Sequence, residues 1–204
     1  MAKMLVDLDI DTIAEATQLE IDAGTDPQTI MKALTDGMNE VGSRYEEGEY
    51  FLTELVLAGE TMKEAFAVLK PHLSAEEKGG KKPVVIATVK GDNHDIGKNI
   101  LGTMLMSAGF EVVDLGIDVS KEDIVESVKK HGAKVVALSC LLTMTIKEIT
   151  LVNDALKDAG LRDTVKLIVG GAPLNMQLAK ELGADDYGAD AIDGVKRIGA
   201  LLEG

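Results

Sequence analysis

The sequence predicts an all-helical N-terminal half followed by an α/β domain with a five-stranded parallel sheet. Up to about residue 75, apolar residues recur at three- and four-residue spacing, as on one face of a helix. After about residue 80, short apolar strands alternate with amphipathic helices. The segment from Ser74 to Lys82 is charged, contains glycine and lacks apolar periodicity, which is typical of a linker. We therefore expect one domain at residues 1–80 and a second at residues 81–204.

Three helices are expected in the first half, at Ile10 to Ile21, Pro27 to Tyr45 and Leu52 to Leu69. The middle helix begins after Thr25-Asp26, because proline is tolerated in the first turn, where its missing N–H needs no partner. Glu46-Glu47-Gly48 interrupts the apolar pattern and ends this helix, and Pro71 ends the third. Three amphipathic helices of this length indicate a helical bundle.

The second half alternates strands and helices, and this order favours a parallel sheet with right-handed crossovers. The expected strands are Val84 to Val89, Glu111 to Leu115, Val135 to Ser139, Val165 to Val169 and a short one at Tyr187. The expected helices are Ile96 to Ala108, Lys121 to Lys130, Ile146 to Ala159, Asn175 to Leu182 and Ala191 to Leu202. Five strands in this format favour the flavodoxin-like (Rossmann-type) order 2-1-3-4-5, whose ligand crevice lies at the carboxyl ends of strands 1 and 3.

Three unusual loops follow strands 1, 3 and 4. They are Gly91 to Lys98, which contains His94, then Ser139 to Thr145, and Gly170-Gly171-Ala172-Pro173. Because the carboxyl ends of parallel strands meet at one edge of the sheet, we expect these loops to converge. The glycine pair is either an ordinary turn or a point where the backbone approaches a bulky ligand. The hydroxyl groups of Ser139, Thr143 and Thr145 either cap the next helix or face the crevice.

His94 is the candidate metal ligand. Asp92 lies two residues earlier, near enough along a turning loop to accept the proton of one ring nitrogen and fix the tautomer. The alternative is a satisfied loop histidine beside two helix-capping residues, Asp92 and Asp95. The position of His94 at the ligand-binding edge of the sheet favours the first interpretation. A zinc site needs three or four protein ligands, so a lone histidine points to an axial position on a metal held by a macrocycle.

Composition excludes several classes of function. The formal net charge is −14, aromatic residues make up 3% of the chain and tryptophan is absent, which argues against nucleic acids and anionic membrane surfaces as partners. No apolar run approaches the roughly 20 residues needed to cross a bilayer. Met1-Ala2-Lys3-Met4 leads into Asp-rich sequence rather than an apolar signal core, so we expect a cytoplasmic location.

Cys140 is the only cysteine, so no disulfide forms within the chain. A nucleophilic thiol needs a second histidine to activate it, and none lies on these loops. We therefore expect Cys140 to be a small buried residue rather than the nucleophile of a thiol enzyme.

Asp92-x-His94-x-x-Gly97 resembles the signature of cobalamin-binding domains that hold the cofactor with its own dimethylbenzimidazole displaced. The longer string from Lys90 to Asn99 resembles the methyltransferase branch of that family. Ser139-x-x-x-Thr143-x-Thr145 is similar to the family's second segment, and Gly170-Gly171 to the glycine pair beside the nucleotide tail. In the helical half, the stretch from Gly42 to Glu54 with Gly48-Glu49-Tyr50-Phe51 resembles the module that caps the upper corrin face in methionine synthase and in small corrinoid proteins.

Two positions depart from the family pattern. Asn93 stands where an apolar residue is more usual, and Thr145 stands where methionine synthase has serine. Threonine keeps the hydroxyl group, so the resemblance in that segment is preserved.

The resemblance implies a role for each motif. His94 is expected as the lower axial ligand of cobalt, with Asp92 and Thr145 as its proton-linked support. Ser139 and Thr143 are expected to contact the nucleotide tail. The full set implied to bind the cofactor is Gly91, Asp92, Asn93, His94, Asp95, Ile96, Gly97, Ser139, Leu141, Thr143, Gly170, Gly171, Ala172 and Phe51.

The resemblance also implies methyl carriage on cobalamin: Co(I) takes a methyl group from one protein's substrate, becomes methyl-Co(III) and passes the methyl group to an acceptor on another protein. A methyl-activating (β/α)₈ barrel needs about 250 residues, more than this chain has. The chain is therefore expected to be a non-catalytic carrier subunit of a corrinoid-dependent methyltransferase or O-demethylase system. The helical cap has to move off the corrin, so we expect a mobile linker near Gly79-Gly80.

The implied partners are a substrate-specific methyltransferase, a second acceptor methyltransferase and a reductive activating protein. The partner selects the methyl donor, which stays open among methoxylated aromatics, methylamines, methanol and betaines. The acceptor stays open as well.

Three other readings remain. The small subunit of an adenosylcobalamin-dependent mutase shares Asp-x-His-x-x-Gly, but the cap segment with Gly48-Glu49-Tyr50-Phe51 speaks against it. A cobalamin sensor would carry a DNA-binding or signalling segment, for which this chain has neither the length nor the basic charge. A response-regulator-like module would need an aspartate at the end of strand 3, where Ser139 stands.

Overall fold

The structure, a computed structural model, describes residues 1–73 and 81–203. It divides into two compact units, one of residues 1–80 with Thr103–Gly109 and one of Lys81–Gly102 with Phe110–Gly204. Most of the expected linker, including Gly79-Gly80, lies outside the described residues. The expectation for its last two residues is wrong, because Lys81 and Lys82 open the first strand, where Lys81 pairs with Phe110.

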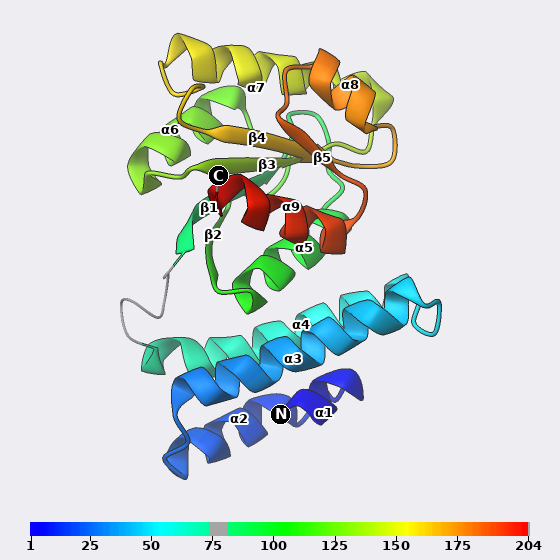
Figure 1. The fold of residues 1–204 in the computed structure, drawn as a ribbon, viewed down its shortest axis with the longest axis vertical. Helices are drawn as coiled ribbons and strands as arrows, with labels where there is room; N and C mark the ends of the chain where they lie inside the picture. The colour runs from blue at the N-terminus through cyan, green and yellow to red at the C-terminus, as the bar shows by residue number, and fades with distance from the viewer. Residues whose placement is uncertain (74–80, 204) are drawn as a thin grey trace. The chain divides into compact units, whose positions relative to one another are not determined.

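In its described part, the helical unit contains four complete α-helices (Figure 1), and Thr103–Gly109 adds the end of α5 (Ile96–Ser107) to it. The four helices are α1 (Ala2–Val6), α2 (Ile13–Asp22), α3 (Pro27–Glu46) and α4 (Leu52–Leu69), and a 3₁₀ turn, η1 (Lys70–His72), follows α4. The three expected helices are confirmed, with α2 beginning three residues later than predicted. The sequence did not predict α1, because five residues are too few to display a helical period.

Specific residues fix the ends and contacts of these helices. Asp26 caps α3 by accepting a hydrogen bond from the Thr29 N–H at 3.1 Å, as its position before Pro27 predicts. Gly37 lets α1 pack against the backbone of α3, since a Cβ there would lie 2.8 Å from the Ala2 carbonyl oxygen. The Tyr50 hydroxyl donates to the Val6 carbonyl at 2.8 Å and thereby ties the turn before α4 to the end of α1.

The second unit is a parallel five-stranded sheet in the order β2-β1-β3-β4-β5, which confirms the predicted topology. The strands are β1 (Lys81–Thr88), β2 (Phe110–Asp114), β3 (Val135–Ser139), β4 (Lys166–Gly170) and β5 (Asp186–Gly188). The helices are α5 (Ile96–Ser107), α6 (Lys121–His131), α7 (Lys147–Asp158), α8 (Met176–Glu181) and α9 (Ala191–Glu203), and a 3₁₀ turn, η2 (Thr143–Thr145), precedes α7.

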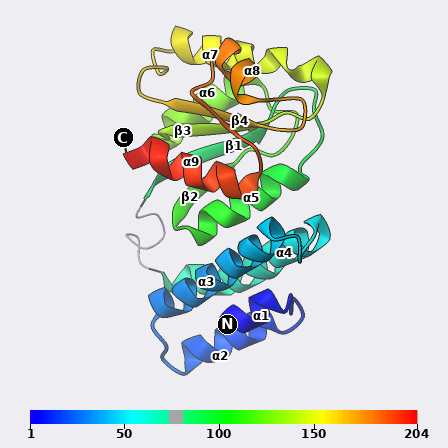
Figure 2. The ribbon, with the colours of Figure 1, turned by 45° about the vertical axis from the view of Figure 1, so that its right-hand side comes forward.

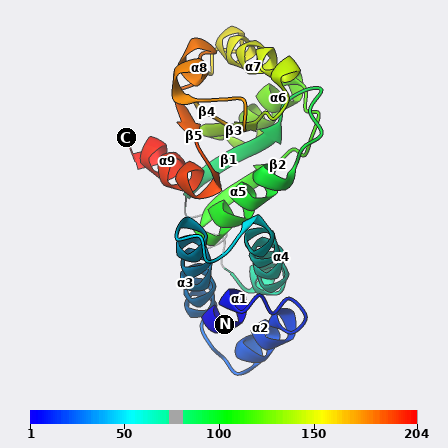
Figure 3. The ribbon, with the colours of Figure 1, turned by 90° about the vertical axis from the view of Figure 1, so that its right-hand side faces the viewer.

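Helices cover both faces of this sheet, as a doubly wound fold requires (Figure 2; Figure 3). α6, α7 and α8 lie on one face, and α5 and α9 lie on the other (Figure 3). The β-strand side chains alternate accordingly: Val85 and Ala87 join the core beneath α6 and α7, while the Ile86 side chain approaches Gly102 of α5. None of the helices in residues 1–73 and 81–203 is long and apolar enough to cross a membrane.

Candidate cofactor site

The loops after β1 and β3 meet at the carboxyl edge of the sheet, and Asp92 joins them. The Leu141 N–H donates to Asp92 Oδ2 at 2.7 Å, and the Leu142 N–H donates to the same oxygen at 3.0 Å. The strands deliver these loops side by side, because Thr88 at the end of β1 pairs with Ser139 at the end of β3. The side chain of Asp92 is fully buried at this junction.

Asp92 is held in its ionised form. Burial by itself would raise the pKa of this carboxyl, but hydrogen bonds from the His94 ring and from the Leu141, Leu142 and His94 amides lower the pKa to about 2. A buried carboxylate with this many donors is stabilised in one orientation, since turning away from it would break several hydrogen bonds to a buried charge. Asp92 therefore acts as a fixed acceptor between two loops.

His94 projects from the same loop and uses Asp92 as its support. Its Nδ1 lies 2.7 Å from Asp92 Oδ1, and its own N–H donates to that oxygen at 3.1 Å. Its carbonyl accepts a hydrogen bond from Thr88 Oγ1 at 2.9 Å, which fixes the peptide. Because ionised Asp92 only accepts, Nδ1 carries the proton of the neutral ring and Nε2 presents a lone pair.

The imidazole is available to a ligand. The His94 side chain is 51% exposed, and within the described part of the chain no hydrogen bond engages Nε2. Across residues 1–73 and 81–203, no group of three or more His, Cys, Asp and Glu side chains could hold a metal ion. A metal bound at Nε2 therefore has to bring its other ligands with it.

Thr145 is buried within the same junction. Its Oγ1 lies 2.9 Å from the Leu142 carbonyl and 3.4 Å from Asp92 Oδ2. A hydroxyl has one proton, so the shorter contact takes it, and the contact with Asp92 is long for a hydrogen bond to a charged group. Cys140, fully buried as expected, places its Sγ 3.4 Å from Thr145 Oγ1, and burial raises the pKa of its thiol.

The other hydroxyl groups of the predicted site remain available. Ser139 is half-buried at the end of β3 and pairs in register with Gly170, while Thr143 is exposed in η2. Within the described chain, neither side chain forms a hydrogen bond. Both can therefore donate to a ligand at this edge.

Close packing against neighbouring backbone explains the glycine pair after β4. Gly171 has φ +133°, and a Cβ there would lie 1.9 Å from the Cys140 carbonyl oxygen. A Cβ on Gly170 would lie 3.2 Å from the Gly188 carbonyl oxygen. Close approach of neighbouring backbone thus already requires glycine at 171, whatever ligand lies nearby, and exposed Ala172 follows it.

Gly97 differs from Gly171, because no neighbouring atom in the described part of the chain requires glycine there. It lies in the first turn of α5, has an ordinary helical φ, and a Cβ added there would meet no atom within 4 Å. Glycine in a helix is less favourable than alanine by about 1 kcal/mol. Its presence beside His94 leaves open space where a bulky ligand would fit.

Large apolar side chains are exposed on these loops, in contrast to the buried core. They come from the loops after β1, β2 and β3 and comprise Ile96, Ile117, Leu141, Leu142 and Met144, the last of which is 83% exposed. Exposed apolar groups gathered in this way mark a binding surface. Together with the free Nε2 of His94 and the space at Gly97, they fit a large, mostly apolar macrocycle whose metal accepts one protein nitrogen.

The remaining predicted residues divide between the two units. Exposed Asn93 and Asp95 lie on the His94 loop, and the Asp95 carboxylate accepts a hydrogen bond from Asn99 Nδ2 at 3.1 Å. Gly91 adopts φ +80°, and a Cβ there would lie 3.3 Å from the Thr145 methyl group. Phe51 belongs to the helical unit, at the N-cap of α4. Its side chain is 68% exposed.

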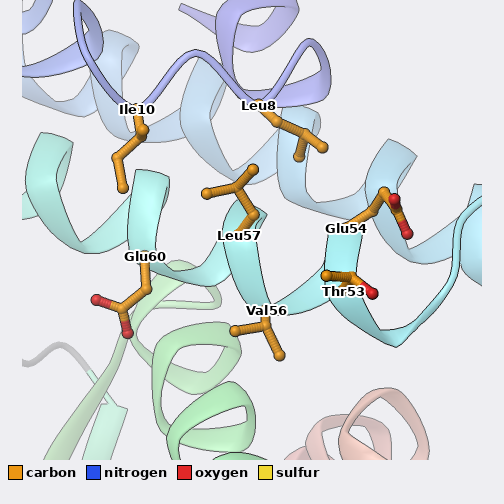
Figure 4. Close-up of a pocket in the computed structure, with 7 residues that line it drawn as sticks. All are labelled: Leu8, Ile10, Thr53, Glu54, Val56, Leu57 and Glu60. Carbon is orange, nitrogen blue, oxygen red and sulfur yellow. The ribbon is translucent and has the colours of Figure 1, made fainter.

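The helical unit contains an open apolar groove of its own (Figure 4). Its volume is about 350 Å³, and it is lined by Leu8, Ile10, Thr53, Glu54, Val56, Leu57 and Glu60. Leu8 and Ile10 lie between α1 and α2, and the other lining residues lie on the first turns of α4 (Figure 4). The groove holds no residue of the His94 junction.

Two interactions near the site escaped sequence reasoning. Buried Lys98 donates to both Asp114 carboxylate oxygens, at 2.7 and 2.6 Å, and to Asn99 Oδ1 at 2.8 Å, which ties the start of α5 to the end of β2. Asp118, in the loop after β2, accepts a hydrogen bond from the Gly91 N–H at 2.7 Å. That hydrogen bond and Lys90 lower the pKa of Asp118. The sequence does contain a signal for this loop. Gly116 and Asp118 follow a strand, and residues of these two types are typical of a loop with positive φ.

Known proteins resemble this chain over nearly its whole length. Two families described as B12 binding domains match residues 82–196 and residues 1–70. Trimethylamine corrinoid protein 1 of Methanosarcina acetivorans is 41% identical over 201 residues, which cover 97% of this chain and 93% of the relative. The dimethylamine corrinoid protein of Methanosarcina barkeri is 43% identical over 176 residues, which cover 86% and 83%.

Solved structures agree with these relatives. A cobalamin-binding protein from Desulfitobacterium hafniense DCB-2 is 42% identical, with a TM-score of 0.77 and coverage of 98% of this chain and 96% of that one. A chain of the methanol:cobalamin methyltransferase complex MtaBC from Methanosarcina barkeri is 33% identical, with a TM-score of 0.85 and coverage of 100% and 78%.

Proposed function

This chain belongs to the family of B12-binding corrinoid proteins of methyltransferase systems, and on that premise we propose that it carries a methyl group on cobalamin from one methyltransferase to another. Cobalamin is its cofactor, and methyltransferases are its partners. The observation that carries the proposal is the His94–Asp92 pair, which offers one free imidazole nitrogen at the edge of the sheet.

In this proposal His94 would hold the cofactor by donating its Nε2 lone pair to the metal in place of the cofactor's own base. Bound cobalamin would supply a cobalt atom that can accept and release a methyl group. Asp92 holds the proton at His94 Nδ1 and orients the ring, while the Leu141 and Leu142 amides hold Asp92. Thr145 supports this junction from within.

Other residues of the loops would hold the cofactor's periphery. The exposed Ile96 and Leu141 side chains would pack against the macrocycle and exclude water. The unpaired hydroxyls of Ser139 and Thr143 would hydrogen-bond the nucleotide tail. We further propose that residues 81–204 form the cofactor domain and that residues 1–80, with Phe51, supply its cap.

The chain is proposed to act as a carrier subunit rather than a complete enzyme. Its partners would be a substrate-specific methyltransferase, a second methyltransferase that takes the methyl group, and a reductive activating protein. Relatives at 41% and 43% identity are named for trimethylamine and dimethylamine, so methylated amines are the donors to test first. Methanol comes next, because a chain of the methanol:cobalamin complex is 33% identical.

The test compares wild-type protein with His94→Ala after anaerobic reconstitution with cobalamin and removal of free cofactor. We expect about one cobalt per chain in the wild type, with ¹⁵N hyperfine splitting in the electron paramagnetic resonance spectrum of the Co(II) form when the protein's histidines are labelled with ¹⁵N. His94→Ala should keep some cobalt through the tail contacts but lose that ¹⁵N splitting. His131→Ala, an exposed histidine at the end of α6, is the matched control and should behave as wild type.

A ¹⁵N-histidine splitting that persists in His94→Ala would overturn the ligand assignment. Methyl carriage is tested separately, by mixing the loaded protein with a methylamine methyltransferase and its substrate. We expect a methylated cofactor on this chain. A tightly bound adenosyl group on the purified protein would instead indicate a mutase subunit.

A further inference from the structure

Asp118, in the loop between β2 and α6, binds the residues that precede His94. Asp118 Oδ1 accepts a hydrogen bond from the Gly91 N–H at 2.7 Å, and its own N–H donates to the Asp92 carbonyl at 3.1 Å. Its Oδ2 lies 3.1 Å from Lys90 Nζ, which also donates to the Asp118 carbonyl at 3.3 Å. One residue therefore contacts three successive residues of the His94 loop.

The backbone of Asp118 is shaped for this contact. Its φ is +54°, in the left-handed region that few residues other than glycine, asparagine and aspartate adopt readily. Gly91, its main partner, also has positive φ, at +80°. Backbone pairing next to this contact also holds the two loops together, since Val119 forms an isolated parallel β-bridge with Val89.

The two supports of the loop act on different groups. The loop after β3 binds the carboxylate of Asp92 through the Leu141 and Leu142 amides. Asp118 instead binds the main chain, at the Gly91 N–H and the Asp92 carbonyl. The carboxylate can hold the His94 ring at a fixed place only if its own backbone is also fixed.

We propose that Asp118 is a positioning residue that holds the backbone of Gly91 and Asp92 so that His94 is presented to the cofactor before cobalamin binds. This inference rests on the proposed ligand role of His94. Replacing Gly91 would disturb the same contact, but any side chain there would also press against Thr145. Substitutions of Asp118 therefore test the contact with fewer side effects. The exposed ion pair with Lys90 is a minor contribution, because such pairs are screened by solvent.

The first test uses the cofactor-free protein and measures amide hydrogen exchange at Gly91 by nuclear magnetic resonance. Asp118→Gly and Asp118→Asn both accommodate positive φ, but only asparagine keeps a side-chain oxygen that can accept the Gly91 N–H. We expect exchange at least roughly tenfold faster in Asp118→Gly and close to wild type in Asp118→Asn. Glu122→Gln, an exposed carboxylate on α6, is the control for loss of charge.

The second test measures the ratio of histidine-on to histidine-off cobalt in the same variants after reconstitution. We expect this ratio to fall about tenfold in Asp118→Gly, as for the loss of one hydrogen bond to a charged group, while cobalt content stays near wild type. Asp118→Asn should restore most of the ratio.

The outcomes separate this inference from the proposed function. Wild-type exchange and ratio in Asp118→Gly would overturn the positioning role, as would Asp118→Asn behaving like Asp118→Gly. If the wild-type protein itself lacks nitrogen-ligated cobalt, the ligand role of His94 fails, and the inference fails with it even where exchange responds to Asp118.

Discussion

At the scale of the residue, one buried carboxylate organises the candidate site. Asp92 Oδ1 serves the ring and the amide of His94, while Oδ2 serves the amides of Leu141 and Leu142. The two oxygens thus link the His94 loop to a loop about 50 residues later in the chain. The orientation of the His94 ring and the stability of the junction depend on the same side chain for this reason.

Asp92→Ala should destabilise the cofactor-free protein by about 2–4 kcal/mol, because the Leu141 and Leu142 amides would lose their acceptor in a buried position. Urea unfolding followed by circular dichroism measures this loss. Asp154→Ala is the control, since this carboxylate is exposed on α7 and forms an ion pair with exposed Lys157, with a long contact of 3.4 Å from Asn153 Nδ2. Its removal should change the free energy of unfolding by less than about 0.5 kcal/mol. An Asp92→Ala variant as stable as this control would contradict the role assigned to Asp92.

Cys140 should react slowly with alkylating reagents in the folded protein. Burial raises its pKa, so the reactive thiolate is scarcer at pH 8 than for an ordinary cysteine, and the side chain is also inaccessible. Labelling with iodoacetamide, read by mass spectrometry between pH 7 and 9, measures the rate, with the protein unfolded in urea as reference. Native labelling as fast as in urea would show that this junction opens readily.

At the scale of the element, glycine occurs in the turn after β4 and in the first turn of α5 under different packing conditions. Gly171 lies where the turn after β4 passes the backbone of Cys140, while Gly97 lies in the first turn of α5 with free space around it. The first position is dictated by packing between loops. At the second position no described atom would exclude a side chain, so a role for Gly97 in cofactor binding stays a prediction.

Gly171→Ala should therefore cost about 3 kcal/mol or more, since the added Cβ would overlap the Cys140 carbonyl and the φ of +133° is unfavourable for alanine. Gly97→Ala should leave the stability unchanged or raise it by up to about 1 kcal/mol. Its affinity for cobalamin should nevertheless fall, by roughly tenfold for a lost close contact. Urea unfolding and equilibrium titration with cobalamin measure the two quantities, and unchanged affinity in Gly97→Ala would remove Gly97 from the site.

At the scale of the whole molecule, charge is unevenly divided along the chain. Residues 1–73 contain fifteen acidic and only five basic residues, so the helical unit carries most of the net negative charge. Polyanions are poor partners for such a surface. The α/β unit is closer to balance, and the loops around His94 expose apolar side chains instead.

Cobalamin should stabilise the folded protein by mass action. At a free cofactor concentration of 100 times the dissociation constant, the gain is about 2.7 kcal/mol, which raises Tm of a unit of this size by roughly 10 °C. Differential scanning calorimetry with and without cofactor measures the shift. His94→Ala should show a smaller shift than wild type, and an equal shift would mean that the axial bond adds no binding energy.

The sequence by itself determined the order of the strands and of the helices other than α1, and the position of His94 on the loop after β1. These properties are local, because apolar periodicity and short motifs lie within a few residues of one another. The flavodoxin-like strand order was predictable from them, since five strands that alternate with helices favour it. The Asp92–His94 contact was also predictable, since two residues of spacing already bring the groups together.

Only the tertiary structure decided which groups support that pair. Main-chain atoms of loops far apart in sequence take part in every one of these contacts. These contacts are the hydrogen bonds from the Leu141 and Leu142 amides to Asp92, the hydrogen bond from the Gly91 amide to Asp118, and the close approach of Gly171 to the Cys140 carbonyl. Every residue except proline has the same N–H group and every residue the same C=O group, so no side-chain pattern marks the ones that will be used. Their role arises when parallel strands bring the loops to one edge of the sheet, and it can be identified only there.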